Sequence, residues 1–202
     1  MEKKTKVIII SVSAAVAIAI AVAVFFVVRR RRNSGRKTAK GLVRYAKSQL
    51  GRPYWWGTNG QTATPELLAK LQQMYPDQYG QAMYSDAPTQ YGQRVHDCAG
   101  LIEAYMWSVD GSKDGEIIPG SNNFPDTTAN NMYASAIEKG DITRPEDVPE
   151  IPGLALHRDR HAGVYIGKGK VIEAKGHKYG VVETDLASGG WQHWFKVPGI
   201  EY

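Results

Sequence analysis

The 202-residue chain has only one cysteine, Cys98, and this scarcity excludes any disulfide within the chain and any cysteine-rich metal site. The sequence also lacks internal repeats and long low-complexity tracts. Its composition is typical of a globular protein, which can bury a core without covalent cross-links. A lone cysteine is most often a small buried apolar side chain, so Cys98 needs further evidence before it is given a chemical role.

Basic side chains are concentrated near the N-terminus. Residues 1–6 and 29–40 contain ten of the 25 Lys and Arg residues but only one of the 20 Asp and Glu residues. Residues 41–202 therefore hold 15 basic and 19 acidic groups, a net charge of −4, although the whole chain carries +5. A domain with this balance offers no basic face for phosphates, so nucleic acid is not an expected partner.

Residues 7–28 form an unbroken run of 22 apolar or small residues. As a helix this run would extend roughly 33 Å, enough to cross the hydrocarbon core of a bilayer. It ends in four arginines and offers no clear small-residue cleavage site, which favours a retained anchor over a signal peptide. The sequence thus predicts a short tail at 1–6, a transmembrane anchor at 7–28, a basic linker at 29–40 and a folded domain at 41–202.

The folded domain is predicted to place helices first and strands afterwards. Helices are expected at 38–50, at 65–74 with Thr64 as N-cap, from Cys98 onward, and at 127–138 with Asp126 as N-cap. Strands are expected at 153–157, 162–166, 170–174, 180–184 and 194–198. Helices followed by an antiparallel meander predict an α+β domain.

Cys98 lies at the predicted start of its helix, with Asp97 as the N-cap. The N-terminus of a helix carries partial positive charge and free N–H groups, and both stabilise a thiolate. We therefore expect the pKa of Cys98 to be lowered. Such a thiol still needs a proton acceptor from another part of the fold.

The segment HAGVYIGKGKVIEA (161–174) is predicted to form a β-hairpin. A three-residue loop at 167–169 would pair Ile166 with Lys170 and Val164 with Ile172. An odd loop keeps residues 161 and 173 on one face, whereas a two-residue loop would send residue 173 to the opposite face. The apolar face would then pack on the far side of the sheet from the Cys98 helix.

On this register the sequence predicts a catalytic triad. His161 and Glu173 are diagonal neighbours within reach of a long side chain. Their face must turn toward the Cys98 helix, and Gly163 would leave room for that approach. Cys98 is then the nucleophile, His161 the base, and Glu173 the carboxylate that orients the imidazole. The alternative is that His161 and Glu173 are ordinary strand residues.

Three motifs together resemble the NlpC-type cell-wall peptidases, which are papain-like cysteine endopeptidases of bacteria. They are PYWWG (53–57), DCAGL (97–101) and HAGVYIGKGKVIEA (161–174), and the resemblance covers roughly residues 38–200. It implies N-terminal helices packed on an antiparallel sheet. It also implies hydrolysis of peptidoglycan stem peptides at the bond after D-glutamate, with no cofactor.

The resemblance also assigns site residues. Cys98 matches the family nucleophile, His161 the base, and Tyr54 the tyrosine that helps to hold the oxyanion or the substrate. Ala99 stands where serine is usual, and Glu173 stands where His, Asn or Gln is more common. Trp55 and Trp56 could line the substrate groove, but tryptophans after a turn are as often part of the core. Further candidates are Asp97 for substrate binding and His177 as an alternative third catalytic residue.

Membrane orientation is predicted in two opposite ways. A cell-wall substrate requires an extracytoplasmic domain on a single-pass anchor in the cell membrane. The flanks hold three Lys or Arg before the span and seven after it, which favours a cytoplasmic domain under the positive-inside rule.

The sequence leaves three alternatives to a cysteine peptidase open. A thiol acyltransferase or amidase would use the same Cys–His pair, and an inactive wall-binding module would use neither residue. His157 and His161 at spacing i, i+4 would suggest zinc on a helix, but strand alternation and the lack of an HExxH pattern argue against a metal. The sequence does not identify protein partners.

Overall fold

The computed structural model describes residues 36–80 and 84–202. The predicted membrane anchor at 7–28 lies outside these residues. In the described part of the chain, no helix combines the length and apolarity needed to cross a membrane. The folded unit spans Lys37–Tyr202.

Four α-helices and eight strands are described in residues 36–80 and 84–202. The helices are α2 (Ala39–Ser48), α3 (Pro65–Met74), α4 (Gly100–Trp107) and α5 (Ala129–Ser135). The strands are β1 (Asn59–Thr62), β2 (Arg94–His96), β3 (Lys139–Asp141), β4 (Ala155–Arg158), β5 (His161–Gly167), β6 (Lys170–Ala174), β7 (Val181–Asp185) and β8 (His193–Phe195). The predicted α+β class is confirmed, although β1, β2 and β3 were not predicted.

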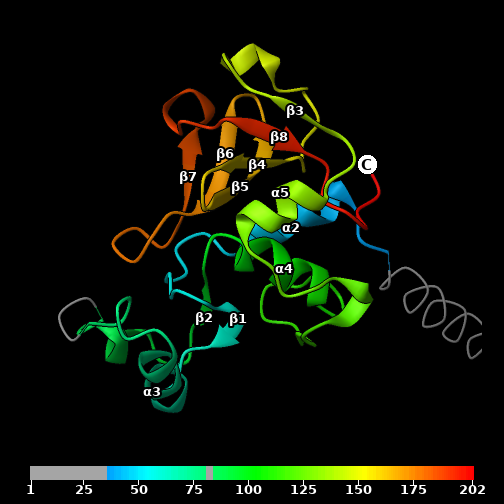
Figure 1. The fold of residues 1–202 in the computed structure, drawn as a ribbon. Coiled ribbons are helices and arrows are strands. Elements are labelled where there is room, and N and C mark those ends of the chain that lie inside the picture. The colour runs from blue at the N-terminus through cyan, green and yellow to red at the C-terminus, as the bar shows by residue number, and fades with distance from the viewer. Residues whose placement is uncertain (1–35, 81–83) are drawn as a thin grey trace, which may run out of the picture. The chain divides into compact units, whose positions relative to one another are not determined.

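Six of the strands form one antiparallel sheet in the order β3-β8-β4-β5-β6-β7. The predicted meander is the run from β4 to β7, and β8 returns to the other side of β4. Helix α2 contacts β5, β6 and α4, while α5 contacts β4. Figure 1 shows these helices gathered on one side of the sheet. The predicted packing of N-terminal helices on an antiparallel sheet is therefore confirmed.

The helix starts agree only in part with the sequence patterns. Thr64 caps α3 as predicted, because its hydroxyl accepts a hydrogen bond from the Leu67 N–H at 3.1 Å. Helix α5 is capped by Thr128, which accepts from the Asn131 N–H at 3.2 Å, so the predicted Asp126 cap is wrong. The helix is also shorter than predicted, because the backbone is already extended at Ala136.

Helix α4 begins at Gly100, two residues later than predicted. Asp97 still caps this end, because its Oδ1 accepts from the Gly100 N–H at 2.7 Å. Glycine is needed there, since a Cβ on Gly100 would lie 2.0 Å from the carbonyl oxygen of Thr58. This close approach holds Cys98, in the turn between Asp97 and the helix, beside the start of β1.

The hairpin of β5 and β6 keeps the predicted register by a different loop. Val164 pairs with Ile172 as predicted, but Gly167 rather than Ile166 pairs with Lys170. The tip is a two-residue turn at Lys168 and Gly169, both with positive φ. A bulge between Tyr165 and Gly167 adds the extra residue. The bulge restores the odd count, so residues 161 and 173 share a face.

The orientation of this hairpin was predicted wrongly. Ala162, Val164 and Ile172 pack in one core with Cys98 and the residues of α4, so the apolar face meets the helices. The opposite face, which includes Tyr165 and Val171, belongs to a second core with Trp191. The apolar face of the hairpin packs against the helices because α2 and α4 bury apolar side chains there. Burial of apolar surface is the main contribution to stability.

Gly163 serves this second core rather than an approach of α4. A Cβ on Gly163 would lie 2.7 Å from Cη2 of Trp191 and 2.9 Å from Cγ1 of Val171. The missing side chain therefore makes room for the indole ring. It follows that His161 can meet Cys98 only at the start of β5, not across the face of the sheet.

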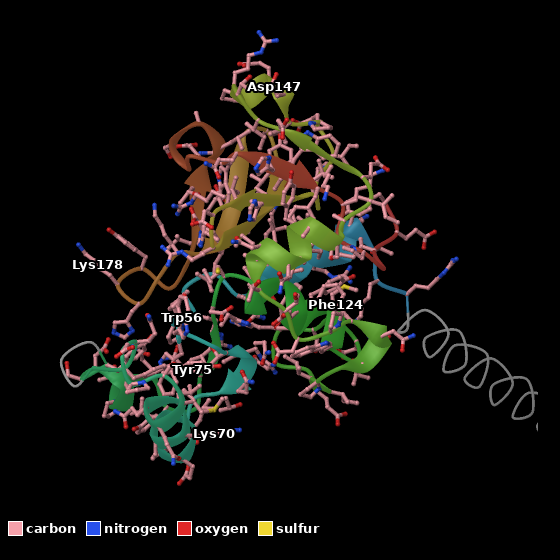
Figure 2. All side chains as sticks on the ribbon, in the orientation of Figure 1. Trp56, Lys70, Tyr75, Phe124, Asp147 and Lys178 are labelled. Atoms are coloured by element: carbon pink, nitrogen blue, oxygen red, sulfur yellow. The ribbon has the colours of Figure 1, made fainter. Side chains whose placement is uncertain are left out.

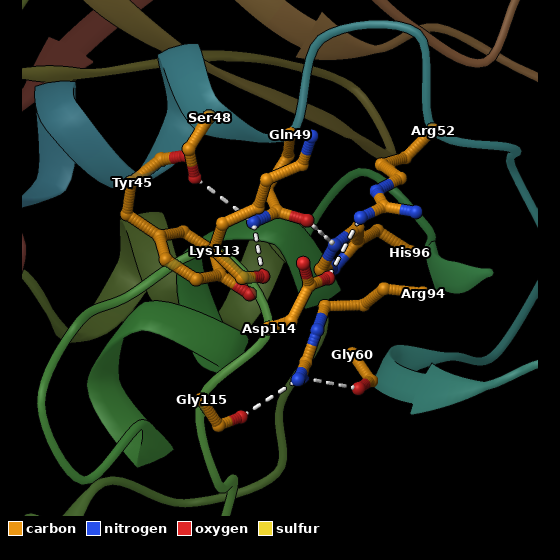
Figure 3. Close-up of polar contacts among 10 residues, drawn as sticks. All are labelled: Tyr45, Ser48, Gln49, Arg52, Gly60, Arg94, His96, Lys113, Asp114 and Gly115. Carbon is orange, nitrogen blue, oxygen red and sulfur yellow. Dashed lines mark hydrogen bonds and ion pairs between the residues drawn. The ribbon is translucent and has the colours of Figure 1, made fainter.

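A buried polar network holds the strand that leads into Cys98 (Figure 3). The Gln49 side chain donates to the Lys113 carbonyl at 2.8 Å and faces Nε2 of His96 at 3.1 Å. Arg94 donates to the carbonyls of Gly60 and Gly115 at 2.7 and 2.6 Å. Burial lowers the pKa of His96 to about 3, so its imidazole stays neutral and can donate to the Gln49 amide oxygen.

Candidate active site

Cys98 lies against the backbone at the start of β5. Its thiol donates to the carbonyl oxygen of Arg160 over 3.6 Å, and a backbone hydrogen bond from Ala162 also reaches the sulfur. These two residues flank His161 in the chain. The sulfur therefore lies against the backbone on either side of His161, at the start of the strand.

The environment of the thiol favours its protonated form. Burial, followed by the charge of Asp97, raises the pKa of Cys98 to about 12, and the backbone hydrogen bonds only partly oppose this. The predicted lowering of the pKa is therefore wrong. The helix terminus is present, but Cys98 is only 7% exposed, and a buried carboxylate beside a thiol opposes ionisation.

His161 and Glu173 form a buried pair. Nε2 of His161 lies 2.6 Å from Oε2 of Glu173, and the hydroxyl of Thr184 donates to Oε1 of Glu173 at 2.7 Å. Burial alone would raise the pKa of Glu173, but these two hydrogen bonds lower it overall. An ionised carboxylate only accepts, so Nε2 of His161 carries a hydrogen and donates it to Glu173.

Trp191 covers one face of the His161 imidazole. The rings of His161 and Trp191 stack with centroids 5.4 Å apart and planes 18° from parallel. Trp191 is itself buried, in the space that Gly163 leaves open. Neither Trp191 nor Thr184 was identified from the sequence. The β6–β7 register could have indicated Thr184, which pairs with Val171 and is diagonal to Glu173.

The aromatic candidates separate into buried and cavity-facing residues. Trp55 is fully buried and bonds through Nε1 to Gln90 Oε1 at 2.6 Å, so its predicted place in the substrate groove is wrong. Trp56 is half-buried and lines the same cavity as Cys98. Burial, and then the charges of Cys98 and Asp97, raise the pKa of Tyr54, so its hydroxyl stays protonated close to the sulfur.

His177 does not contact the candidate base. Its Nε2 lies 2.9 Å from Asp86 Oδ1 and its Nδ1 lies 3.4 Å from the Tyr54 carbonyl. Its ring also packs on Tyr84 with centroids 4.2 Å apart. Of the two predicted third residues, it is therefore Glu173 that meets His161.

Cys98 opens into a cavity of about 540 Å³. The cavity is bounded by the chain before β1, the ends of α3 and α4, and the segment that enters α5. Its lining residues are Trp56, Gly57, Asn59, Tyr75, Asp97, Cys98, Ala99, Glu103, Asp126, Thr127, Thr128, Ala129, Asn130, Asn131 and Arg160. Such a volume is within the range of small-molecule and peptide sites, so the thiol is accessible to a substrate.

Asn130 was not predicted, yet it fixes the turn that contacts the thiol. Its Oδ1 accepts from the Arg160 N–H at 2.7 Å and lies 3.0 Å from Nε2 of His157. Its Nδ2 donates to Asp159 Oδ1 at 2.9 Å. Residues on two elements, α5 and β4, thus hold the Arg160 carbonyl in place. A residue that acts through tertiary contacts of this kind leaves no signal in local spacing.

Among residues 36–80 and 84–202, no group of three or more His, Cys, Asp or Glu side chains could hold a metal ion. His157 and His161 lie on adjacent strands, β4 and β5, and not on one helix. The helical spacing that would have suggested zinc is therefore not realised.

No family model matches the sequence, and no curated protein matches it. Solved structures do match. The peptidoglycan hydrolase RipB from Mycobacterium tuberculosis is 18% identical, with a TM-score of 0.46 over 86% of this chain and 68% of that one. The P60 domain of an antigen from M. avium subspecies paratuberculosis is 19% identical, with a TM-score of 0.45 over 85% and 98%. NlpC2 from Trichomonas vaginalis is 19% identical, with a TM-score of 0.41 over 77% and 46%.

The chain is similar to NlpC and P60 proteins, as its motifs predict.

Proposed function

We propose that the chain is a cysteine endopeptidase that hydrolyses peptidoglycan stem peptides, at the bond after D-glutamate. The observation that carries the proposal is the buried His161–Glu173 pair, placed at the strand start where the Cys98 sulfur contacts the backbone on both sides of His161. The substrate class follows from the resemblance of the three motifs to NlpC-type peptidases.

In the resting site the thiol is protonated, because burial and the charge of Asp97 raise the pKa of Cys98 to about 12. When the scissile carbonyl enters the cavity, the thiol proton passes to Nδ1 of His161 as the sulfur attacks carbon. Glu173 stabilises the imidazolium through Nε2, as the third member of a triad does. The protonated hydroxyl of Tyr54 and nearby backbone N–H groups are the donors available to the oxyanion.

The remaining steps complete hydrolysis. The imidazolium gives its proton to the leaving amine as the C–N bond breaks, and a thioester joins the acyl group to Cys98. His161 then removes a proton from water, which attacks the thioester and releases the carboxylic acid and the thiol. Each step uses Nδ1 for proton transfer and keeps Nε2 on Glu173.

The proposal is tested by digestion of purified peptidoglycan with the full chain, with Cys98→Ala alongside. We expect new stem-peptide fragments by mass spectrometry with the native chain alone, and a mass that locates the cut after D-glutamate. Equal fragment patterns from both proteins would end the hydrolase proposal. A persistent acyl adduct on Cys98, with no more than one amine fragment released per enzyme molecule, would instead indicate a thiol acyltransferase.

We further propose that residues 7–28 anchor the chain in the cell membrane, with the folded unit outside the cytoplasm. The length and apolarity of that run support an anchor, and a cell-wall substrate supports this orientation. Added protease should then degrade the folded unit in intact wall-stripped cells. Protection of the unit until the membrane is lysed would contradict the orientation and agree with the flanking charges.

A further inference from the structure

The cavity beside Cys98 has two unlike walls. One wall is aromatic, with the half-buried rings of Trp56 and Tyr75 on either side of Gly57. The other wall comes from the segment that enters α5 and is polar, with Asp126 and Asn131 both exposed. Binding of a peptide at the thiol would not by itself require one aromatic wall and one polar wall.

The aromatic wall is rigid. The Tyr84 hydroxyl accepts from the Trp56 N–H at 3.1 Å, and the Tyr79 hydroxyl donates to the Trp56 carbonyl at 2.6 Å. The rings of Tyr79 and Tyr84 stack at 4.2 Å between centroids, in the small core beneath α3. The backbone of Trp56 is therefore fixed by hydrogen bonds that need no ligand.

Tyr75 is fixed beside Trp56. It is the C-cap residue of α3, and its ring rests on Gly57, where a Cβ would lie only 2.7 Å from Cε2 of the ring. Gly57 also has φ of +72°, which glycine adopts without strain. Figure 2 labels both aromatic residues near one another, between α3 and the body of the fold. The two rings thus form one preorganised surface.

An aromatic surface opposite exposed carboxylate and amide groups fits a sugar ring. The C–H face of a pyranose packs on aromatic rings, while its hydroxyl and N-acetyl groups form hydrogen bonds with Asp and Asn. Preorganised rings cost little entropy on binding, so such a surface contributes affinity efficiently. Because Cys98 opens into the same cavity, a bound sugar would be joined to the peptide that is cut.

We propose that this cavity binds an N-acetylated amino sugar stacked on Trp56 and Tyr75, so that glycan-linked stem peptides are cut in preference to free ones. This inference rests on the proposed function, since it names the form of the substrate at the same site. Trp56, Tyr75 and the segment before α5 then bind the sugar. Cys98 and His161 act on the peptide.

The test compares kcat/KM of the full chain on a disaccharide-linked tetrapeptide and on the same free tetrapeptide. We expect a preference of about tenfold or more for the linked form. Trp56→Leu and Tyr75→Leu should each bring the ratio toward one. Tyr179→Leu, at a residue that is 54% exposed and does not line the cavity, is the control and should keep the ratio. Equal kcat/KM on both substrates would overturn the inference and leave the proposed function standing.

If neither substrate is cut, the proposed function fails, and binding tests the sugar site by itself. The probe is an N-acetylglucosamine oligomer titrated into the full-length Cys98→Ala variant by calorimetry. Binding that is lost when Trp56→Leu is added, and kept with Tyr179→Leu, would support the sugar site. No binding to Cys98→Ala would overturn it.

Discussion

Two buried carboxylates flank the candidate site, and their surroundings affect them in opposite ways. Asp97 accepts only from backbone N–H groups, and burial raises its pKa to about 6. Glu173 is only 1% exposed, but the side chains of His161 and Thr184 hydrogen-bond to it and lower its pKa. Two carboxyl groups at one site thus differ because one has an imidazole partner and the other does not.

The difference prepares the two halves of the site for different tasks. The charge of Asp97 lies beside the thiol and raises the pKa of Cys98, so the sulfur keeps its proton. The charge of Glu173 lies on the imidazole and supports the cation that forms when the proton arrives. The comparison therefore supports a protonated resting thiol, as the proposed mechanism requires.

The largest expected effect comes from removing the charge of Glu173. Glu173→Gln should lower kcat/KM by about 10³-fold, because an amide cannot support the imidazolium and can stabilise the wrong tautomer. The measurement is hydrolysis of a stem-peptide substrate at constant pH. Glu183→Gln is the matched control, since Glu183 is exposed on β7 and should leave the rate unchanged. A loss smaller than about threefold for Glu173→Gln would show that this carboxylate does not serve the base.

Removing the charge of Asp97 should lower the pKa of the Cys98 thiol and so make it more reactive. In Asp97→Asn the side chain can still cap α4, but the charge that raises the pKa of Cys98 is gone. We expect the rate of alkylation of Cys98 by iodoacetamide to rise about tenfold near pH 8, in proportion to the thiolate fraction. Its pH profile should shift to lower pH. An unchanged profile would mean that burial alone sets the pKa of the thiol.

A smaller effect is expected from the second donor to Glu173. Thr184→Val keeps the shape of the side chain but removes the hydroxyl that donates to Oε1 at 2.7 Å. The pKa of Glu173 should rise toward its ordinary value, so the acidic limb of the pH–rate profile moves to higher pH. We expect kcat/KM to fall about three- to tenfold, in line with one hydrogen bond to a charged group. A loss of rate with no shift of the acidic limb would assign that limb to a group other than Glu173.

Local pattern predicted the parts of this site that depend on a few neighbouring residues. The capping role of Asp97, the pairing of Val164 with Ile172 and the meeting of His161 with Glu173 all follow from spacing within one turn or one hairpin. Because a bulge and a two-residue turn give the same parity as a three-residue loop, residues 161 and 173 share a face as predicted, although the loop differs.

Tertiary packing decided what the sequence patterns could not. The hairpin faces α4 with its apolar side because residues from distant segments compete for burial there, and no local spacing records that competition. The pKa of Cys98 was predicted in the wrong direction for the same reason. A helix terminus is visible in sequence, whereas the burial that opposes ionisation depends on tertiary packing, and the charge of Asp97 adds to it.

The smallest expected effect concerns a third carboxyl group, Glu103. It tests whether burial raises the pKa of another carboxyl group that lacks an imidazole partner, as it does for Asp97. Glu103 accepts from the Thr127 N–H at 2.7 Å and from Asn59 Nδ2 at 3.3 Å, and has no cationic partner among these contacts. Burial raises its pKa from 4.5 to about 8, so it behaves like Asp97 rather than Glu173.

The sign of the resulting pH dependence follows from linkage. Between pH 4.5 and about 8 the unfolded chain loses the Glu103 proton while the folded chain keeps it, so stability falls as pH rises. Asp97 contributes the same sign up to about pH 6. Glu103→Gln should therefore reduce the drop in Tm between pH 5 and pH 8. Each kcal/mol of stability change corresponds to a Tm change of about 2–4 °C. Glu183→Gln should retain the native drop, and an equal drop in both variants would show that Glu103 is ionised in the fold across this range.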